Sequence, residues 1–395
     1  MTSFEEHLEQ ILETTRRQDL FRRLREVQSA SDVTLTLHSE TITSFASNDY
    51  LGLANHPQLK EAARDATDRF GAGSGASRLI TGSLTPHRDL ENRLASFKGT
   101  QAALVFNSGY QTAVGVLSAV LTEHDVVFSD RLNHACLIDG IRLSKAKTKV
   151  FNHNDAKHLE SLLKETSEQQ HSGEIKKGNW LIVTESVFSM DGDQAPLNQI
   201  AQLKKEFGAW LMIDEAHATG FFGKNRSGLV EASGLSDQVD IHMGTLGKAL
   251  GSAGGFVCGS QALREVLINR ARSFIFSTAP TPASAAAATA ALSLVESAEG
   301  ERRAKDLWER VKQLREGLNL SGEIHSPIIP YIVGDEAQSL ALSQKLLEQR
   351  ILVPAIRYPS VPRGEARLRI TLSANHTEEQ VNQLVSALNS QAQTA

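Results

Sequence analysis

Short apolar runs recur through the middle of the chain, and the intervals between them leave room for helices. Six of these runs have the length of a buried strand: residues 102–106, 125–129, 149–152, 180–184, 210–213 and 239–243. The first run is followed by a helical pattern over residues 111–121. Strands that alternate with helices form a mostly parallel sheet covered by helices on both faces. The pattern therefore predicts an α/β fold for this part of the chain.

The N-terminal residues show a helical period and then a strand pattern. Ser3 and Glu6 match a capping box, which marks the start of a helix. Residues 34–37 and 41–45 predict a short hairpin. Between these features the apolar residues keep a helical spacing with one interruption, which predicts one or two amphipathic helices that lie on the main body of the protein: Leu8, Ile11, Leu12, Leu20, Leu24 and Val27.

The C-terminal third begins with an alanine-rich helix pattern over residues 283–294. Strand and helix patterns then follow as a smaller α+β unit: strands 328–333, 351–356 and 367–371, and helices 337–349 and 377–391. We therefore expect three parts. These are an N-terminal helical segment with a hairpin (1–46), a large α/β domain (47–282) and a small C-terminal domain (283–395).

Polar and glycine positions gather directly after the predicted strands. Ligands of open α/β sheets bind at the carboxyl ends of the strands. A single polar residue after a strand is usually a turn former. Here complementary groups follow several strands, which predicts that they share one edge of the sheet: Gly109, His134, Ser189, Asp214, His217, Thr245 and Lys248.

Lys248 stands in a segment of glycines and apolar residues, between Gly247 and Gly251. Burial in such surroundings would lower its pKa from roughly 10.4. A lysine with a lowered pKa is a nucleophilic amine that can bond covalently to an aldehyde. By itself, the segment is equally consistent with a glycine-rich turn that holds an incidental lysine.

Composition narrows the class of protein. The chain has 395 residues, a formal net charge of −5 and a pI of about 6.2, which disfavours nucleic-acid binding. Cys136 and Cys258 lie among apolar or small residues and are expected to be reduced core residues. No apolar run approaches the roughly 20 residues of a membrane span, and the N-terminus lacks the apolar region of a signal peptide. A soluble cytoplasmic protein without membrane contact is expected.

Pyridoxal phosphate needs the combination of groups found at the predicted edge. Lys248 could bind its aldehyde, and Asp214 could pair with its ring nitrogen at a lowered carboxyl pKa. His217 could hydrogen-bond its phenolic oxygen, and His134 could stack on its ring. The remaining groups could hold its phosphate or orient its ring: the Gly109 and Tyr110 amides, Ser189 and Thr245.

Two other interpretations of these residues exist. Asp214 and His217 could be a helix cap and a buried neutral histidine. Asp214, His217 and His134 could also form a zinc site. A zinc site leaves Lys248 and the phosphate-type turns unexplained, so no metal is expected.

Seven stretches together resemble the α-oxoamine synthases, a family of fold-type-I pyridoxal phosphate enzymes. The stretches are residues 47–53, 133–134, 187–193, 213–220, 244–248, 276–278 and 367–370. The resemblance covers nearly the whole chain. It implies that Lys248 carries the cofactor and removes the α-proton of an amino acid substrate, with His134 and Asp214 beside it as catalytic groups.

The resemblance also implies a substrate site and an assembly. Arg369 would bind the carboxylate of the amino acid. Ser277 and Thr278 would reach the phosphate in a neighbouring subunit, which implies a homodimer with shared sites. The other substrate-side positions that match the family are Arg22, Asn48, His134 and Ser360.

Within the family, residues 355–362 are similar to the branch that serves biotin biosynthesis. That branch joins L-alanine to a pimeloyl thioester, carried by CoA or acyl carrier protein, and releases CO₂. Residues 133–143 are also similar to the branch that joins glycine to acetyl-CoA. Some family members have lost the lysine and act as non-catalytic partners, but Lys248, Asp214 and His217 are present here.

Overall fold

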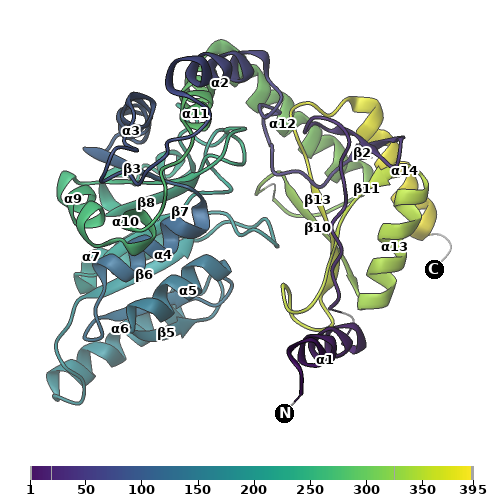
Figure 1. Ribbon diagram of the computed structural model, residues 1–395. Helices are drawn as coiled ribbons and strands as arrows, with labels where there is room; N and C mark the ends of the chain where they lie inside the picture. Colours follow the sequence, from purple (N-terminus) through teal and green to yellow (C-terminus); the bar gives the residue numbers. More distant parts are fainter. Residues whose placement is uncertain (1, 19, 324, 393–395) are drawn as a thin grey trace.

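A computed structural model describes residues 2–18, 20–323 and 325–392. Its larger part is built on a seven-stranded sheet (Figure 1). In spatial order the strands are β3 (Ala102–Phe106), β9 (Gly255–Gly259), β8 (Ile241–Thr245), β7 (Trp210–Asp214), β6 (Trp180–Glu185), β4 (Val126–Asp130) and β5 (Lys147–Phe151). The strands from β8 to β5 pair in parallel. Strand β9 pairs antiparallel with both β8 and β3, so β3 runs in the same direction as the parallel strands.

Alternate residues of the sheet strands enter two separate apolar cores, one on each face of the sheet. In β3, Ala103 and Val105 belong to one core, and Leu104 and Phe106 belong to the other. This is expected for strands covered on both faces. Helices α4 (Gly109–Val120), α5 (Ala135–Ser144), α9 (Gln261–Arg270) and α10 (Arg272–Ile275) cover one face. Helices α3 (Thr85–Lys98), α6 (Ala156–His171) and α7 (Leu197–Phe207) cover the other.

The smaller part lies beside the large sheet and contains two three-stranded sheets (Figure 1). One has the order β10 (Ile328–Gly334), β13 (Ala366–Thr371) and β12 (Ala355–Ile356). The other joins the hairpin β1 (Thr34–Leu37) and β2 (Glu40–Ser44) to β11 (Ile351–Leu352). Helices α12 (Ala298–Gly317), α13 (Glu336–Glu348) and α14 (Glu378–Ala392) pack against these sheets. The N-terminal hairpin thus pairs with the C-terminal part of the chain.

The remaining short or connecting elements lie around this frame. Helix α11 (Pro282–Glu296) packs on α2 (Pro57–Phe70) and α3 and leads into α12. Helix α8 (Leu229–Ala232) and a single 3₁₀ turn at Ser236–Gln238 precede β8.

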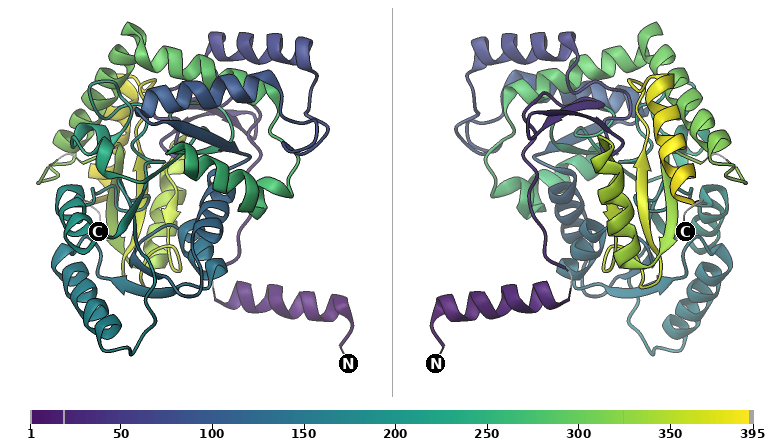
Figure 2. Two further views of the ribbon diagram at one scale, coloured as in Figure 1. Left: turned by 90° about the vertical axis from the view of Figure 1, so that its left-hand side faces the viewer. Right: turned by 90° about the vertical axis from the view of Figure 1, so that its right-hand side faces the viewer.

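The α/β class, the six predicted strands, the hairpin and the alanine-rich helix are confirmed. Three expectations are wrong. Residues 20–27 form no helix. Residues 351–356 form two short strands in different sheets, separated by Val353 and Pro354. The N-terminal helix, expected to lie on the main body, instead stands apart from it (Figure 2). The predicted boundaries at residues 46 and 282 stay a prediction.

Helix α1 (Phe4–Arg17) stands apart from the body of the protein (Figure 2). Its capping box is present, because the Ser3 side chain accepts from the Glu6 amide and the Glu6 carboxylate accepts from the Ser3 amide. The helix is amphipathic, yet none of its residues is buried. Its apolar side, including Phe4 and Ile11, is therefore exposed in the single chain.

Cys136 and Cys258 are free and buried, as predicted. Burial raises the pKa of the Cys258 thiol to about 12, which keeps it in the unreactive protonated form. Across the described residues, no helix is both long enough and apolar enough to cross a membrane.

Candidate active site

The carboxyl edge of the large sheet brings the predicted cofactor residues together. Asp214 ends β7 and Thr245 ends β8, while Gly109 begins the helix that follows β3. Strand β3 lies two positions from β8, and Gly109 approaches Thr245 so closely that a Cβ atom on Gly109 would lie 3.7 Å from the Thr245 Cβ. The shared direction of the strands therefore gathers these residues, as the sequence predicted.

Lys248 lies in the tight connection between β8 and β9. The connection is closed by a bond from the Leu246 amide to the Gly254 carbonyl and by one from the Gly251 amide to the Lys248 carbonyl at 2.8 Å. Gly251 has a φ of 58°, and a Cβ atom there would lie 2.5 Å from the backbone of Leu53. Glycine thus allows the segment 47–53 to pack directly against the lysine loop.

The amine of Lys248 is held 2.7 Å from the Nε2 atom of His217. Burial lowers the pKa of Lys248 to about 8, although the negative charges of Asp214 and Glu185 act in the opposite direction. Burial and the nearby Lys248 and Arg369 cations lower the pKa of His217 well below its usual value, so its ring is neutral. The sequence predicted a nucleophilic lysine, and its surroundings agree with that prediction.

Two buried carboxyl groups lie behind the lysine. Asp214 in β7 pairs in register with Glu185 in β6, which places both side chains on one face. Burial raises the pKa of Asp214, and burial together with Asp214 raises that of Glu185 well above its usual range. Burial thus outweighs the attraction of Lys248 in the protein without cofactor, and the lowered Asp214 pKa expected beside a protonated ring nitrogen stays a prediction. A pair of crowded carboxyls favours a cationic group at this place.

His134 is positioned by the start of α5. Its Nδ1 atom accepts a hydrogen bond from the Cys136 amide at 3.2 Å and so caps the helix. Its own amide donates to the Glu185 carboxylate at 2.7 Å. Burial lowers the pKa of His134, so a neutral ring faces the site. Glu185, which the sequence analysis did not select, thus fixes the backbone of His134.

The turn after β3 and the segment 276–278 meet beside α4. The Asn107 side chain donates to the Ser277 hydroxyl and to the Thr278 carbonyl, both at 2.8 Å. Thr278 also pairs with Ser77 in an isolated bridge. Tyr110 is in the first turn of α4, where backbone amides point outward, and its hydroxyl donates to Asp139 at 2.7 Å. Within one chain, the start of α4 and the segment that carries Ser277 and Thr278 therefore lie close together.

Arg369 links the two parts of the protein. Its Nε atom donates to the Ser189 carbonyl at 2.5 Å, and its Nη1 atom donates to the Asn48 side chain at 3.2 Å. The Tyr50 hydroxyl lies 3.3 Å from the same Asn48 oxygen and 2.6 Å from the Nδ1 atom of His217. A continuous set of hydrogen bonds therefore runs from Arg369 to Lys248, and Tyr50 is a member that sequence reasoning missed.

Arg22 and Ser360 lie together at a cavity of about 290 Å³, apart from the lysine cluster. Ile356 and Tyr358 also line this cavity. Strand β12 borders it and pairs with β13, the strand that carries Arg369. The structure thus brings Asn48 and Arg369 into contact, while Arg22 and Ser360 lie together beside strand β12 of the same small sheet.

A buried ion pair supports the turn that follows Asp214. Lys98 donates to the Glu215 carboxylate at 2.8 Å and to the Thr219 hydroxyl at 3.1 Å. Both charged side chains are 1% exposed. Removal of one partner of such a pair leaves an unpaired buried charge, so this pair fixes residues 215–219 firmly. In the sequence, Lys98 at a helix end gave no signal of burial.

These groups fit pyridoxal phosphate. The edge offers an amine with a lowered pKa, two crowded carboxyls, two neutral histidines and the N-terminus of a twelve-residue helix. The amine suits the aldehyde of the cofactor, and the carboxyls suit a ring nitrogen that gains a proton. The histidines suit the phenolic oxygen and the aromatic face, and the helix N-terminus suits the phosphate. In the described part of the chain, no cluster of three or more potential ligands is arranged to hold a metal.

Comparison with known sequences assigns the chain to a family. Residues 40–388 match the family described as aminotransferase class I and II. The 8-amino-7-oxononanoate synthase of Geotalea daltonii is 47% identical over 381 residues, which cover 95% of both chains. The 8-amino-7-oxononanoate synthase of Bacillus pumilus is 41% identical over 390 residues, which cover 98% of this chain and 97% of the relative.

Solved structures share the fold. Serine palmitoyltransferase of Sphingomonas wittichii has a TM-score of 0.91 at 29% identity and covers 100% of this chain and 99% of its own. The S. paucimobilis enzyme, which contains pyridoxal phosphate joined to myriocin, has a TM-score of 0.90 at 27% identity, with 98% and 97% covered. The 8-amino-7-oxononanoate synthase of Francisella tularensis has a TM-score of 0.73 at 29% identity, with 89% and 98% covered.

The fold and the lysine site together define a fold-type-I pyridoxal phosphate enzyme. The relatives that are 41% and 47% identical match nearly the whole chain, and this extent assigns the chain to a particular group of enzymes. The chain belongs to the class I and II aminotransferase family and, within it, to the 8-amino-7-oxononanoate synthases. The predicted family and its cofactor are confirmed.

Proposed function

We propose that the protein joins L-alanine to a pimeloyl thioester and forms 8-amino-7-oxononanoate, CO₂ and the free thiol of the carrier, as a step of biotin biosynthesis. The observation that carries the proposal is the hydrogen-bonded path from Lys248 to Arg369, which sets a nucleophilic amine and a carboxylate anchor at two ends of one site. The names of the relatives that match along the whole chain supply the product.

The groups around Lys248 would control proton transfer at the α-carbon of alanine. Bound pyridoxal phosphate supplies an electron-withdrawing ring at this carbon. Lys248 would bind the cofactor, and its amine would take the α-proton. Asp214 would keep the ring nitrogen protonated, and His217 would donate to the phenolic oxygen. His134 would cover one face of the ring and exclude water from it.

The phosphate would lie at the start of α4. The amides of Gly109 and Tyr110 point outward there, and the Thr245 hydroxyl is adjacent to Gly109. Ser189 would border the ring on the side of Arg369, because its carbonyl accepts from that guanidinium.

Arg369 would bind the carboxylate of alanine. Its guanidinium can form two parallel hydrogen bonds with a carboxylate, and it is already held by Ser189, Asn48 and Thr371. A fixed guanidinium loses little freedom when the substrate binds. Asn48 shares this end of the path and would contact the same carboxylate.

The new carbon–carbon bond forms between the α-carbon of alanine and the thioester carbonyl, and the carbon–sulfur bond breaks. The thiol leaves with a proton. The bond from the same α-carbon to the alanine carboxylate then breaks and releases CO₂, and the electron pair left on that carbon takes up a proton. The pimeloyl chain would extend toward the cavity that Arg22 and Ser360 line, because this cavity lies on the sheet that carries Arg369. The carrier is CoA or acyl carrier protein, and the enzyme is expected in the cytoplasm.

Alanine with pimeloyl-CoA should exceed glycine with acetyl-CoA in kcat/KM by at least about 100-fold, the scale expected when a site built for a larger group is left unfilled. Both pairs are measured on one preparation of protein loaded with pyridoxal phosphate. A preference for glycine and acetyl-CoA would instead assign the chain to the 2-amino-3-ketobutyrate CoA ligase reaction and leave the cofactor chemistry intact.

The working unit is proposed to be a homodimer whose sites use both chains. Apolar side chains beside the Ser77–Thr278 bridge are exposed in the single chain, with Ile80 at 75% and Phe276 at 71%. Apolar residues of α1 are exposed as well. In a dimer that covers these surfaces, Ser277 and Thr278 of each chain would lie next to the phosphate bound by the other chain.

Mixing two inactive variants tests the shared site. Lys248→Ala and Thr278→Ala chains, co-expressed, should recover about a quarter of the wild-type specific activity, because about half of randomly paired dimers combine the two chains and hold one intact site. Lys248→Ala with Asp214→Ala is the control, since both residues serve the same chain's site and no intact site forms. Equal failure of the two mixtures would contradict a shared site.

A further inference from the structure

Five side chains form one line of hydrogen bonds across the junction of the two parts of the protein. Lys248 Nζ lies 2.7 Å from His217 Nε2, and His217 Nδ1 lies 2.6 Å from the Tyr50 hydroxyl. The hydroxyl lies 3.3 Å from Asn48 Oδ1, which also accepts from Arg369 Nη1 at 3.2 Å. Tyr50 is the middle member, and its bond to His217 is much shorter than its contact with Asn48.

The donors and acceptors in this line follow from the chemistry of its ends. The ammonium of Lys248 can only donate, so Nε2 of His217 must accept. A neutral imidazole has one N–H, and it must then be on Nδ1 and donate to the Tyr50 oxygen. The single proton of Tyr50 is left to donate to Asn48. In the cofactor-free protein, the hydrogen bonds between Lys248 and Asn48 thus all point toward Asn48, whose oxygen also accepts from Arg369.

We propose that Tyr50 is a positioning residue that reverses its hydrogen bond when the cofactor binds, and that it thereby links cofactor binding to the substrate end at Asn48 and Arg369. The inference rests on the proposed function for the identity of the two ends. When His217 Nε2 donates to an anionic oxygen of the cofactor, its Nδ1 atom becomes an acceptor. The Tyr50 proton then turns to Nδ1, and Asn48 loses a donor. The side-chain amide of Asn48 is then free to reorient and contact a substrate carboxylate beside Arg369.

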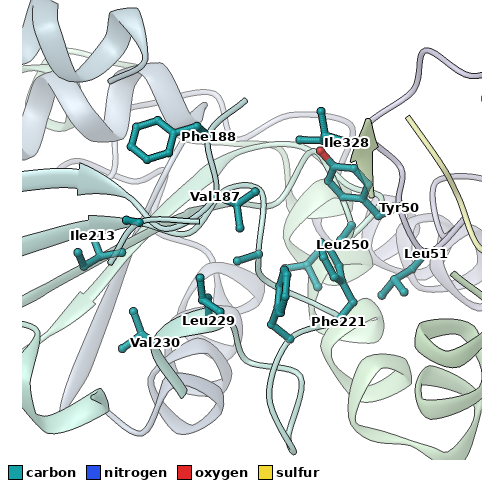
Figure 3. Close-up of a cluster of buried hydrophobic side chains, with 14 of the residues drawn as sticks. Tyr50, Leu51, Val187, Phe188, Ile213, Phe221, Leu229, Val230, Leu250 and Ile328 are labelled. Carbon is teal, nitrogen blue, oxygen red and sulfur yellow. The ribbon is translucent and has the colours of Figure 1, made fainter. Parts of the chain in front are cut away.

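The surroundings of Tyr50 suit such a role. The residue is completely buried and packs edge-to-face on Phe221 with the ring centres 5.2 Å apart. Figure 3 shows its ring among apolar side chains such as Leu250 and Ile328. Burial raises the pKa of Tyr50 to about 12, so the hydroxyl keeps its proton at neutral pH. A fixed ring whose hydroxyl has one proton and contacts His217, Asn48 and Arg369 can change the direction of a bond without moving the backbone.

The position of the proton on His217 tests the inference directly. Nitrogen-15 spectra of the histidine rings are recorded for the cofactor-free and the pyridoxal phosphate-loaded protein, and the His217 signals are identified by their loss in His217→Asn. The proton should be on Nδ1 without cofactor and on Nε2 with cofactor. The same protonated nitrogen in both states would overturn the proposal. This measurement uses no acyl substrate, so it is independent of whether the proposed reaction is correct.

The Tyr50→Phe variant tests the hydroxyl itself. It should retain the cofactor absorption band, shift the His217 Nδ1 signal and weaken the binding of alanine, or of glycine as a second probe, by about fivefold to tenfold, the value of one hydrogen bond. Tyr331→Phe, which removes a hydroxyl from strand β10 outside the line, is the matched control and should change none of these. A Tyr50→Phe protein with unchanged His217 signals and unchanged amino acid affinity would refute the role of the hydroxyl.

Discussion

Replacement of Lys248 by alanine should abolish the visible absorption of the bound cofactor and lower turnover by at least about 10³-fold, because it removes both a covalent attachment and a proton acceptor. The Lys248→Arg protein is the matched control. Arginine keeps the positive charge next to His217 but stays protonated and cannot attach the cofactor. Absorbance spectra and steady-state rates are measured for the wild-type, Lys248→Ala and Lys248→Arg proteins. A Lys248→Ala enzyme that keeps the visible band and normal turnover would refute this role of Lys248.

The pH dependence of cofactor uptake follows from the same lysine. The amine attacks only when it is unprotonated, and burial lowers its pKa to about 8. The rate at which cofactor-free wild-type protein takes up pyridoxal phosphate should therefore rise with pH and level off above about pH 8. An exposed lysine would level off near roughly pH 10.4. Uptake that continues to rise to that pH would contradict a buried, activated amine.

Replacement of Asp214 by alanine is expected to separate cofactor binding from catalysis. Lys248 can still attach the cofactor, but the ring nitrogen loses the carboxylate that keeps it protonated. Exchange of the α-hydrogen of alanine in deuterated water should slow by about 10²-fold or more, the scale of one lost electrostatic partner. Nuclear magnetic resonance of alanine follows this exchange without any thioester.

Asp214→Asn distinguishes charge from shape in this experiment. Asparagine keeps the acceptor for the Ala216 amide, which Asp214 binds at 2.9 Å, but carries no charge. It should be nearly as slow as alanine. Exchange at the wild-type rate in either variant would show that Asp214 does not support the cofactor ring.

The residues that the sequence predicted well are those whose position depends on chain direction. Asp214, Thr245 and Lys248 each follow a short apolar strand, and the parallel order of those strands carries them to one edge. The parallel direction of the strands follows from the alternation of strand and helix patterns and from the length of the connections, which are local features of the sequence. The edge and its chemistry could therefore be predicted without knowledge of side-chain contacts.

The elements that the sequence concealed depend on tertiary contacts. Strand β9 is glycine-rich because Gly255 packs against the start of α4, where a Cβ atom would lie 2.6 Å from the Gly109 nitrogen. Glycine normally indicates a turn, which is why strand β9 is not among the predicted strands. Residues 20–27 have a helical spacing but form no helix, since spacing alone cannot supply a surface to pack on.

The supporting residues of the site were concealed for another reason. Lys98 and Glu185 carry charges that usually face solvent, and their burial depends on partners distant in the sequence. Tyr50 was visible within a motif, but its contact with His217 joins residues 167 positions apart. Pairings of this kind need the folded chain, because neither residue alone indicates the other.

The fate of the carboxyl carbon of alanine tests the central claim most directly. Alanine labelled with carbon-13 at the carboxyl position is incubated with pimeloyl-CoA and the loaded enzyme, and gas, free thiol and product are measured together. The account predicts one labelled CO₂ for each thiol released and an unlabelled 8-amino-7-oxononanoate identified by its mass. Label retained in a product, or thiol released without labelled CO₂, would contradict decarboxylative condensation.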